Sequence, residues 1–115
     1  MLQYLGDLDG AAPQLARARL DPTGLAEAAR QIVDGLRAVV AAGYVHGDLS
    51  AYNLLWWQEQ VWFIDFPQAV DLAANPLALD YLHRDVHNIA RWLDGRGRAI
   101  DPEAVFAELV GGAFR

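Results

Sequence analysis

Apolar residues recur at helical spacing along the segment from residue 21 to residue 43. The segment opens with Asp21-Pro22, a pair that is typical of a helix start, because aspartate caps the first turn and proline suits the first helical position. Gly43 is typical of a left-handed helix end. Between them the apolar positions recur every three or four residues: Leu25, Ala29, Ile32, Val33, Leu36, Val39 and Val40. The pattern predicts one long helix with a single buried stripe.

Two further segments show the same periodicity. Asn75-Pro76 is a second helix start, and Gly95 marks its end. Its predicted buried stripe consists of Leu79, Leu82, Val86, Ile89, Ala90 and Leu93. Asp101-Pro102 begins a third helix, expected to stop at Gly111-Gly112, with the apolar positions Val105, Phe106, Leu109 and Val110. We interpret residues 11–20, which include Pro13, as a loop or one short helical turn.

A β-hairpin is predicted between the first two helices. The runs Leu54 to Trp57 and Val61 to Ile64 are rich in β-branched and aromatic residues. The polar residues Gln58-Glu59-Gln60 separate them and suggest a three-residue connection. Asn53 precedes the first strand and Asp65 follows the second, so antiparallel pairing should bring their side chains to the same end.

The oxygen-bearing side chains of Asp48, Asn53 and Asp65 suit a hard cation. Magnesium prefers carboxylate or carbonyl oxygens and fills its remaining positions with water and phosphate oxygens. Asp48, five residues before Asn53, can then face a metal-bound phosphate and accept or orient a hydroxyl proton. Taken singly, each of these residues would more often cap a turn or bond the local backbone. Their joint spacing favours a nucleotide and metal site.

The spacing also resembles a known family. The run His46-Gly-Asp-Leu-Ser-Ala-Tyr-Asn53 and the run Ile64-Asp-Phe-Pro-Gln-Ala-Val70 are similar to the catalytic loop and metal motif of the RIO family of atypical protein kinases. A third block, Asn75-Pro76 with Arg84-Asp85-Val86 and Asn88-Ile89, resembles the helix that follows in RIO1-like members. The resemblance spans roughly residues 44 to 93, and its separate blocks agree in order.

The resemblance implies an α+β fold, namely a protein-kinase-like C-terminal lobe with three main helices around a small β-hairpin. It implies phosphoryl transfer from Mg-ATP to a protein serine or threonine, or ATP hydrolysis, with ATP and Mg2+ as cofactors. Asp48 would be the catalytic carboxylate, and Asn53 and Asp65 the metal ligands. Asp65 would also be a candidate phosphate acceptor in an aspartyl-phosphate cycle. The expected partners are a protein substrate or a pre-ribosomal particle.

Other positions take their expected roles from the same resemblance. Gln3 and Leu5 lie where the family's hinge backbone meets adenine, Leu55 would lie under the adenine ring, and Ile64 would line the same site. Three residues would support the loop. His46 is expected to pack there, and Asp85 to accept backbone N–H bonds from it. Ser50 could contact a phosphate or cap the turn, and we favour the cap. For His46 and Leu55, ordinary core burial is the alternative interpretation.

The chain contains no lysine, although a kinase normally brings a strand lysine and a Gly-rich loop from an N-terminal lobe. We therefore interpret residues 1–6 as a hinge remnant and residues 7–115 as an isolated C-terminal lobe. Such a chain would be a fragment, a truncated gene product or a degenerate member. A missing N-terminal lobe is then a possible partner.

Composition narrows the function further. A length of 115 residues with 54% hydrophobic content fits one small domain. The net charge of -6 disfavours general nucleic-acid binding. Without cysteine there is no disulfide or thiolate metal site. No apolar run reaches the length of a membrane span, so we expect a cytoplasmic protein without membrane contact.

Three alternatives stay open. A small-molecule kinase of the aminoglycoside-phosphotransferase type shares the His-Gly-Asp loop, although residues 67–70 and 84–89 disfavour it. A catalytically inactive docking module is the alternative from another functional class. Finally, His83 and His87 are four residues apart and could hold zinc together, but the sequence offers no third ligand at a recognisable spacing.

Overall fold

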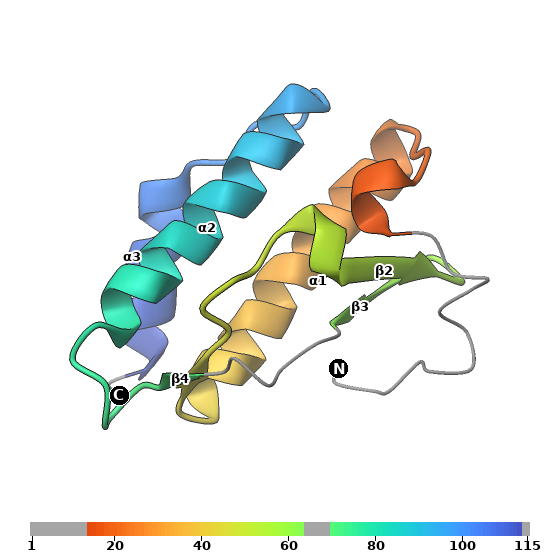
Figure 1. The fold of residues 1–115 in the computed structure, drawn as a ribbon. Coiled ribbons are helices and arrows are strands. Elements are labelled where there is room, and N and C mark those ends of the chain that lie inside the picture. Colours follow the sequence, from red (N-terminus) through yellow and green to blue (C-terminus); the bar gives the residue numbers. More distant parts are fainter. Residues whose placement is uncertain (1–13, 64–69, 114–115) are drawn as a thin grey trace.

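Three helices and two small antiparallel sheets make up the described part of the chain, which comprises residues 14–63 and 70–113 of a computed structural model (Figure 1). In chain order the elements are η2 (Leu15–Arg17), α1 (Pro22–Ala41), β1 (Tyr44–Val45), η3 (Ala51–Asn53), β2 (Leu54–Trp57), β3 (Gln60–Phe63), β4 (Val70–Asp71), α2 (Ala78–Gly95) and α3 (Pro102–Ala113). The predicted α+β fold, with three main helices around a small hairpin, is confirmed.

Helix α1 begins and ends where its sequence predicts. The Asp21 side chain accepts a hydrogen bond from the Gly24 N–H at 2.6 Å, and Gly43 closes the segment with a φ of +93°. That backbone angle favours glycine because it has no Cβ. All of the predicted stripe except Val33 is buried, and Val33 is half-buried.

The boundaries of the other two helices differ from the prediction. Helix α2 begins at Ala78, because the Asn75 side chain accepts the Leu77 N–H at 2.8 Å and so caps the preceding turn rather than the helix. Helix α3 starts at Pro102 as predicted, with the Asp101 carboxylate accepting two N–H groups. It continues through Gly111 and Gly112 to Ala113, so the predicted stop is wrong. Glycine inside a helix costs only about 0.5–1 kcal/mol, which does not end a helix by itself.

The hairpin has a shorter connection than predicted. Strands β2 and β3 pair from Leu54 opposite Phe63 to Trp57 opposite Gln60, which leaves only Gln58 and Glu59 in the turn. Both turn residues have positive φ, 52° and 59°, as a two-residue primed turn requires. The Gln31 side chain of α1 supports this turn, since it donates to the Glu59 carbonyl at 3.1 Å and accepts the Val61 N–H at 2.7 Å.

A second, smaller sheet lies next to the loop that follows α1. Strand β1 pairs with β4, with Tyr44 opposite Asp71 and Val45 opposite Val70. The Leu72 N–H extends this pairing by donating to the Gly43 carbonyl at 2.8 Å. The chain that enters the loop is therefore tied to the chain that leads into α2.

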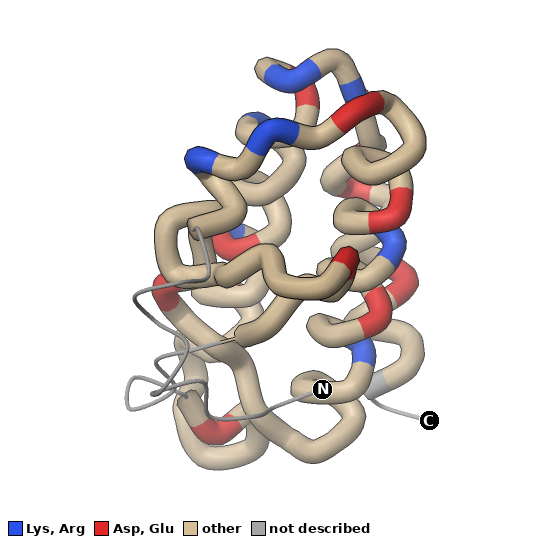
Figure 2. The backbone as a smooth tube through the Cα atoms, turned by 90° about the vertical axis from the view of Figure 1, so that its right-hand side faces the viewer, with Lys and Arg blue, Asp and Glu red and all other residues tan. Residues whose placement is uncertain are grey.

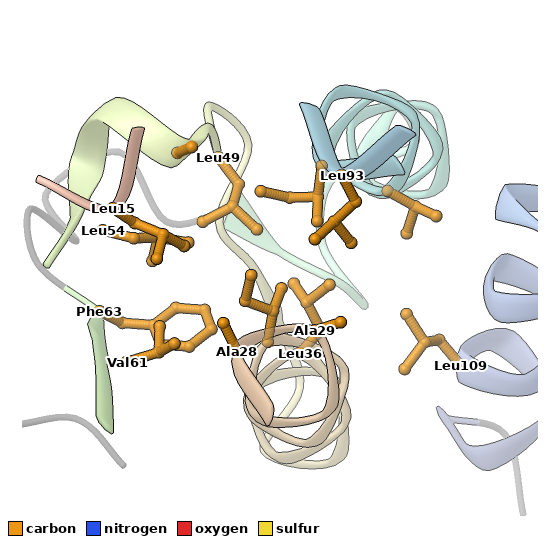
Figure 3. Close-up of a cluster of buried hydrophobic side chains, with 14 of the residues drawn as sticks. Leu15, Ala28, Ala29, Leu36, Leu49, Leu54, Val61, Phe63, Leu93 and Leu109 are labelled. Carbon is orange, nitrogen blue, oxygen red and sulfur yellow. The ribbon is translucent and has the colours of Figure 1, made fainter. Parts of the chain in front are cut away.

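The core lies where all these elements meet, with α1 between the hairpin and the other two helices (Figure 3). One continuous cluster draws on the hairpin, on α1, on the loop before η3 and on α2 and α3. Figure 3 labels ten of its residues: Leu15, Ala28, Ala29, Leu36, Leu49, Leu54, Val61, Phe63, Leu93 and Leu109. Burial of apolar area of this kind is the main favourable term in folding. Leu49 belongs to this core, so the loop is anchored by packing as well as by hydrogen bonds.

Charged residues of both signs are interspersed along the helices (Figure 2). Arg37 bonds Asp34 on its own helix at 2.6 Å and also bonds Glu108 of α3, while Arg30 bonds Asp34 at 2.8 Å. Arg30 and Arg37 therefore take part in ion pairs on the exposed side of α1. Exposed pairs of this kind contribute about 0–1 kcal/mol each. None of the helices in the described ranges is both long and apolar enough to cross a bilayer.

A close contact between α1 and β3 makes Gly35 a sensitive position. A Cβ at Gly35 would lie 2.5 and 2.6 Å from two ring carbons of Phe63, a side chain that is only 3% exposed. Gly35→Ala should lower the free energy of unfolding by about 1–3 kcal/mol, because overpacking outweighs the gain in helix propensity of about 1 kcal/mol.

The matched control for this prediction is Gly111→Ala in α3, where a Cβ would meet nothing within 4 Å. That change should stabilise the chain by roughly 0.5–1 kcal/mol. Urea unfolding measures both variants. A Gly35→Ala chain as stable as the Gly111→Ala chain would contradict the close contact.

Candidate active site

The loop between β1 and β2, residues 46–53, carries most of the site residues that the structure describes. Gly47 is buried and has a φ of +90°, so the chain turns sharply at a position that favours glycine. The loop ends in η3, one short 3-10 turn. The elements on either side hold both ends of the loop, because β1 is paired with β4 and β2 with β3.

Asp85 of α2 lies beneath this loop and bonds its backbone twice. One carboxylate oxygen accepts the Gly47 N–H at 2.8 Å and the other accepts the Leu49 N–H at 3.0 Å. Asp85 is completely buried. Burial raises its pKa above the usual value, and the bonds from Leu49 and Gly47, together with nearby His46 and Arg84, oppose that rise. The carboxylate thus fixes the two amides that flank Asp48.

His46 and Arg84 hold the same stretch from other sides. The His46 ring is 2% exposed, and its Nδ1 accepts the Asp48 N–H at 3.2 Å. Because Nδ1 accepts this bond, a neutral His46 ring carries its proton on Nε2. Arg84 donates to the Gly47 carbonyl. We predicted no role for Arg84 from the sequence, although its position beside Asp85 in the Arg-Asp-Val block was a usable signal.

Ser50 and Asn53 form a reciprocal capping arrangement at the second half of the loop. The Ser50 N–H donates to the Asn53 amide oxygen at 2.9 Å, and the Ser50 hydroxyl accepts the Tyr52 N–H at 3.2 Å. The Asn53 Nδ2 donates to the Asp48 carbonyl at 2.6 Å. These bonds fix the orientation of the Asn53 amide and leave its oxygen a second lone pair.

The carboxylate of Asp48 lies at the exposed surface of this fixed loop, and it makes no hydrogen bond to any described residue. Its backbone, in contrast, is bonded through both the N–H and the carbonyl. Asp48 is therefore a charged group on a rigid support, free to meet a ligand. An arrangement of this kind suits general-base work or the orientation of a hydroxyl group.

Of the remaining predicted site residues, the structure describes Leu55 but not the other four. Leu55 is 4% exposed and pairs with Trp62, and strand alternation puts it on the hairpin face opposite to Leu54. Gln3, Leu5, Ile64 and Asp65 lie outside the described residues. Leu54 pairs with Phe63 at the end of the hairpin that Asn53 adjoins, and the approach of Asn53 to Asp65 stays a prediction.

Comparison with known proteins identifies the class. A family model described as the RIO domain matches residues 1–105, so the chain belongs to the RIO family. Its relatives are named as serine/threonine kinases. It is 37% identical to the RIO-type serine/threonine-protein kinase Rio1 of Thermoplasma acidophilum, over 91% of this chain and 53% of that protein. It is 32% identical to human serine/threonine-protein kinase RIO3, over 96% of this chain and 22% of that protein.

The fold is also found among solved structures. The Rio2 kinase of Chaetomium thermophilum, crystallised as a complex with ADP, Mg2+ and phosphoaspartate, superposes with a TM-score of 0.71 at 23% identity. The match covers 91% of this chain and 34% of that one. The chain thus spans about half the length of the Thermoplasma relative, and smaller shares of the other two proteins.

Loss of the Asp85 carboxylate should release the loop. Asp85→Ala leaves the Gly47 and Leu49 N–H groups buried without an acceptor, at about 1–3 kcal/mol each. Removal of the buried acid also removes its desolvation cost, but that gain is smaller, because the two hydrogen bonds already stabilise the buried carboxylate. We expect a loss of roughly 2–5 kcal/mol of unfolding free energy, together with increased backbone mobility of residues 46–50 in NMR relaxation.

Asp94→Ala is the matched control, because Asp94 is an exposed aspartate on the same helix. Its unfolding free energy should change by less than about 0.5 kcal/mol. Where Asp85→Ala proves too unstable to study, Asp85→Asn keeps the volume and should still loosen the loop. Wild-type stability and loop order in both Asp85 variants would refute the supporting role.

Proposed function

We propose that this chain forms the catalytic-loop part of a RIO-type site, which binds Mg-ATP and either transfers the γ-phosphoryl group to a protein serine or threonine hydroxyl or hydrolyses ATP. The observation that carries the proposal is the exposed Asp48 carboxylate on a loop whose flanking backbone is bonded to Asp85, His46 and Asn53. The kinase names of the relatives and the ADP and Mg2+ of the Rio2 complex support the same chemistry.

The described donor set fits a magnesium ion. The Asn53 amide oxygen is held in place and retains a lone pair, and a hard cation prefers such oxygen ligands. We assign Asn53 and Asp65 as the residues that would hold it, Asp65 on the family resemblance alone. When bound, the ion would supply charge neutralisation for the phosphate oxygens.

The roles of the chain's own residues follow from their positions. Asp48 would accept or orient the proton of the attacking hydroxyl group or water. The backbone of Gln3 and Leu5 would meet the adenine edge, while Leu55 and Ile64 would contact its ring. Because these 115 residues contain no lysine, the usual lysine contact to the α- and β-phosphates has to come from elsewhere. We therefore expect weak nucleotide binding and slow turnover from this chain alone.

An aspartyl-phosphate cycle is the second candidate, and the phosphoaspartate of the Rio2 complex favours it. In that cycle a carboxylate oxygen of Asp65 attacks the γ-phosphorus of ATP, and the bond to the departing ADP breaks. Water then attacks the phosphorus of the acyl phosphate, releasing inorganic phosphate and the free carboxylate. Acid-quenched mass spectrometry after incubation with ATP would detect the intermediate on Asp65.

Calorimetric titration with ATP, with and without Mg2+, tests the proposal. Wild-type protein should bind ATP in the presence of Mg2+ and lose most of that affinity in EDTA. Asp65→Asn should weaken the magnesium-dependent binding at least about tenfold, because one carboxylate ligand is replaced by a neutral oxygen. Asp48→Asn should retain binding while phosphate release from ATP falls by roughly 100-fold or more.

Asp80→Asn, an exposed aspartate of α2 outside the loop, is the control and should behave like wild type in both assays. ATP affinity that is the same with Mg2+ and with EDTA would rule out the proposed metal site. In that case a docking module without nucleotide chemistry becomes the better description of the chain.

A further inference from the structure

A second cluster of metal-ligating side chains lies away from the loop, between α2 and α3. His83 and His87 project from one side of α2, and Glu103 lies in the first turn of α3. The Nε2 atoms of both rings lie within hydrogen-bond distance of the same Glu103 oxygen, at 2.8 Å for His83 and 2.5 Å for His87. Glu103 is the third ligand that sequence spacing did not reveal, because only the packing of the two helices brings it to the histidines.

The helices and their packing hold this cluster in place. The His83 and His87 rings lie one helical turn apart, with centroids separated by 4.2 Å. The Phe106 and His83 rings meet in a T-shaped arrangement with centroids 4.9 Å apart. The Glu103 N–H donates to the Asp101 carboxylate, which caps α3. Hydrogen bonds from His87 and His83 favour the charged carboxylate and so lower the Glu103 pKa below its usual value.

We propose that His83, His87 and Glu103 form a zinc site that joins α2 to α3. Two imidazole nitrogens and one carboxylate oxygen are a ligand set that Zn2+ takes in proteins, with water in the fourth position. The side chains of the three residues are 43%, 34% and 63% exposed, which leaves room for that water. The metal preference of this site also differs from that of the loop, because imidazole nitrogens suit Zn2+ whereas the oxygen ligands of the loop suit Mg2+.

The ligand atoms need only small movements to enclose the ion. All three lie within 4.8 Å of one another, and ligands at zinc distances of 2.0–2.1 Å in a tetrahedral site stand roughly 3.3 Å apart. The two Nε2–oxygen distances, 2.8 and 2.5 Å, are shorter than this spacing, so the Glu103 carboxylate would move slightly outward on zinc binding. In the metal-free protein both rings donate to Glu103 through Nε2–H. On zinc binding each ring carries its proton on Nδ1 instead, which frees the Nε2 lone pairs.

Zinc at this position would act on the fold rather than on the phosphate chemistry. It would replace two hydrogen bonds between α2 and α3 with coordinate bonds. Asp85, which holds the loop, lies on α2 between the two histidines in sequence. A ligand that binds only the folded state stabilises it by an amount that grows with the logarithm of the ligand concentration relative to its dissociation constant. Zinc should therefore raise the melting temperature of the whole domain.

The test is a calorimetric titration of the full chain with Zn2+. A large excess of Mg2+ is present throughout, so that sites made only of oxygen ligands are already occupied. Co2+ serves as a visible-absorption probe of coordination geometry. We expect one Zn2+ per chain, a four-coordinate Co2+ spectrum, and a shift of the His83 and His87 imidazole nitrogen resonances that reports the Nδ1–H tautomer. Glu103→Gln and His87→Gln each remove a direct zinc ligand. Either change should lower the zinc affinity by more than the roughly 10- to 100-fold that is typical when only a hydrogen-bond partner of a ligand is lost.

Glu108→Gln, which removes another exposed carboxylate of α3, is the control and should bind zinc like wild type. Circular dichroism of the metal-free variants shows whether each is folded. If one of the Glu103 and His87 variants does not fold, the other one still provides the test. The proposal is overturned if wild type takes up no stoichiometric Zn2+ in the presence of Mg2+. It is equally overturned if folded Glu103→Gln and His87→Gln bind zinc as tightly as Glu108→Gln.

Discussion

The buried carboxylate of Asp85 is the constraint on which the candidate site depends. It accepts the N–H groups of Gly47 and Leu49, and so fixes the backbone on both sides of Asp48. Burial disfavours its charged form and so raises its pKa, while the two hydrogen bonds and the nearby His46 and Arg84 favour that form. The interaction persists because opening it would leave two buried N–H groups without an acceptor, at about 1–3 kcal/mol each.

The surrounding fold delivers this carboxylate to the loop. Helix α2 carries Asp85 on the same side as Leu82, Val86 and Ile89, so core packing fixes its position. Leu49 anchors the loop from within the same core, and the bonds of His46 and Asn53 hold Asp48 from the other directions. The Asp48 carboxylate that this arrangement leaves exposed therefore stands on a fixed backbone, and positioning of that kind is what phosphoryl-transfer chemistry requires.

The predictable parts of the structure were those set by local sequence. Apolar periodicity and the Asp21-Pro22 and Asp101-Pro102 caps located α1 and the start of α3, because these signals act within one turn. The Gln58-Glu59 turn was not predictable, since neither residue favours positive φ and its support comes from Gln31 on a distant helix. The contact of Glu103 with His83 and His87 was missed for the same reason, as it arises only from helix packing. The motif spacing indicated Asp48 and Asn53, but the bonds that orient them required the fold.

Amide hydrogen exchange at Gly47 and Leu49 in the wild-type chain measures the two Asp85 bonds most directly. If the buried carboxylate holds the loop as described, both amides exchange as slowly as core amides of α2 such as that of Ile89, although they belong to no helix or strand. Exchange of these two amides at the rate of exposed turns would contradict it, because the loop would then open without the rest of the fold.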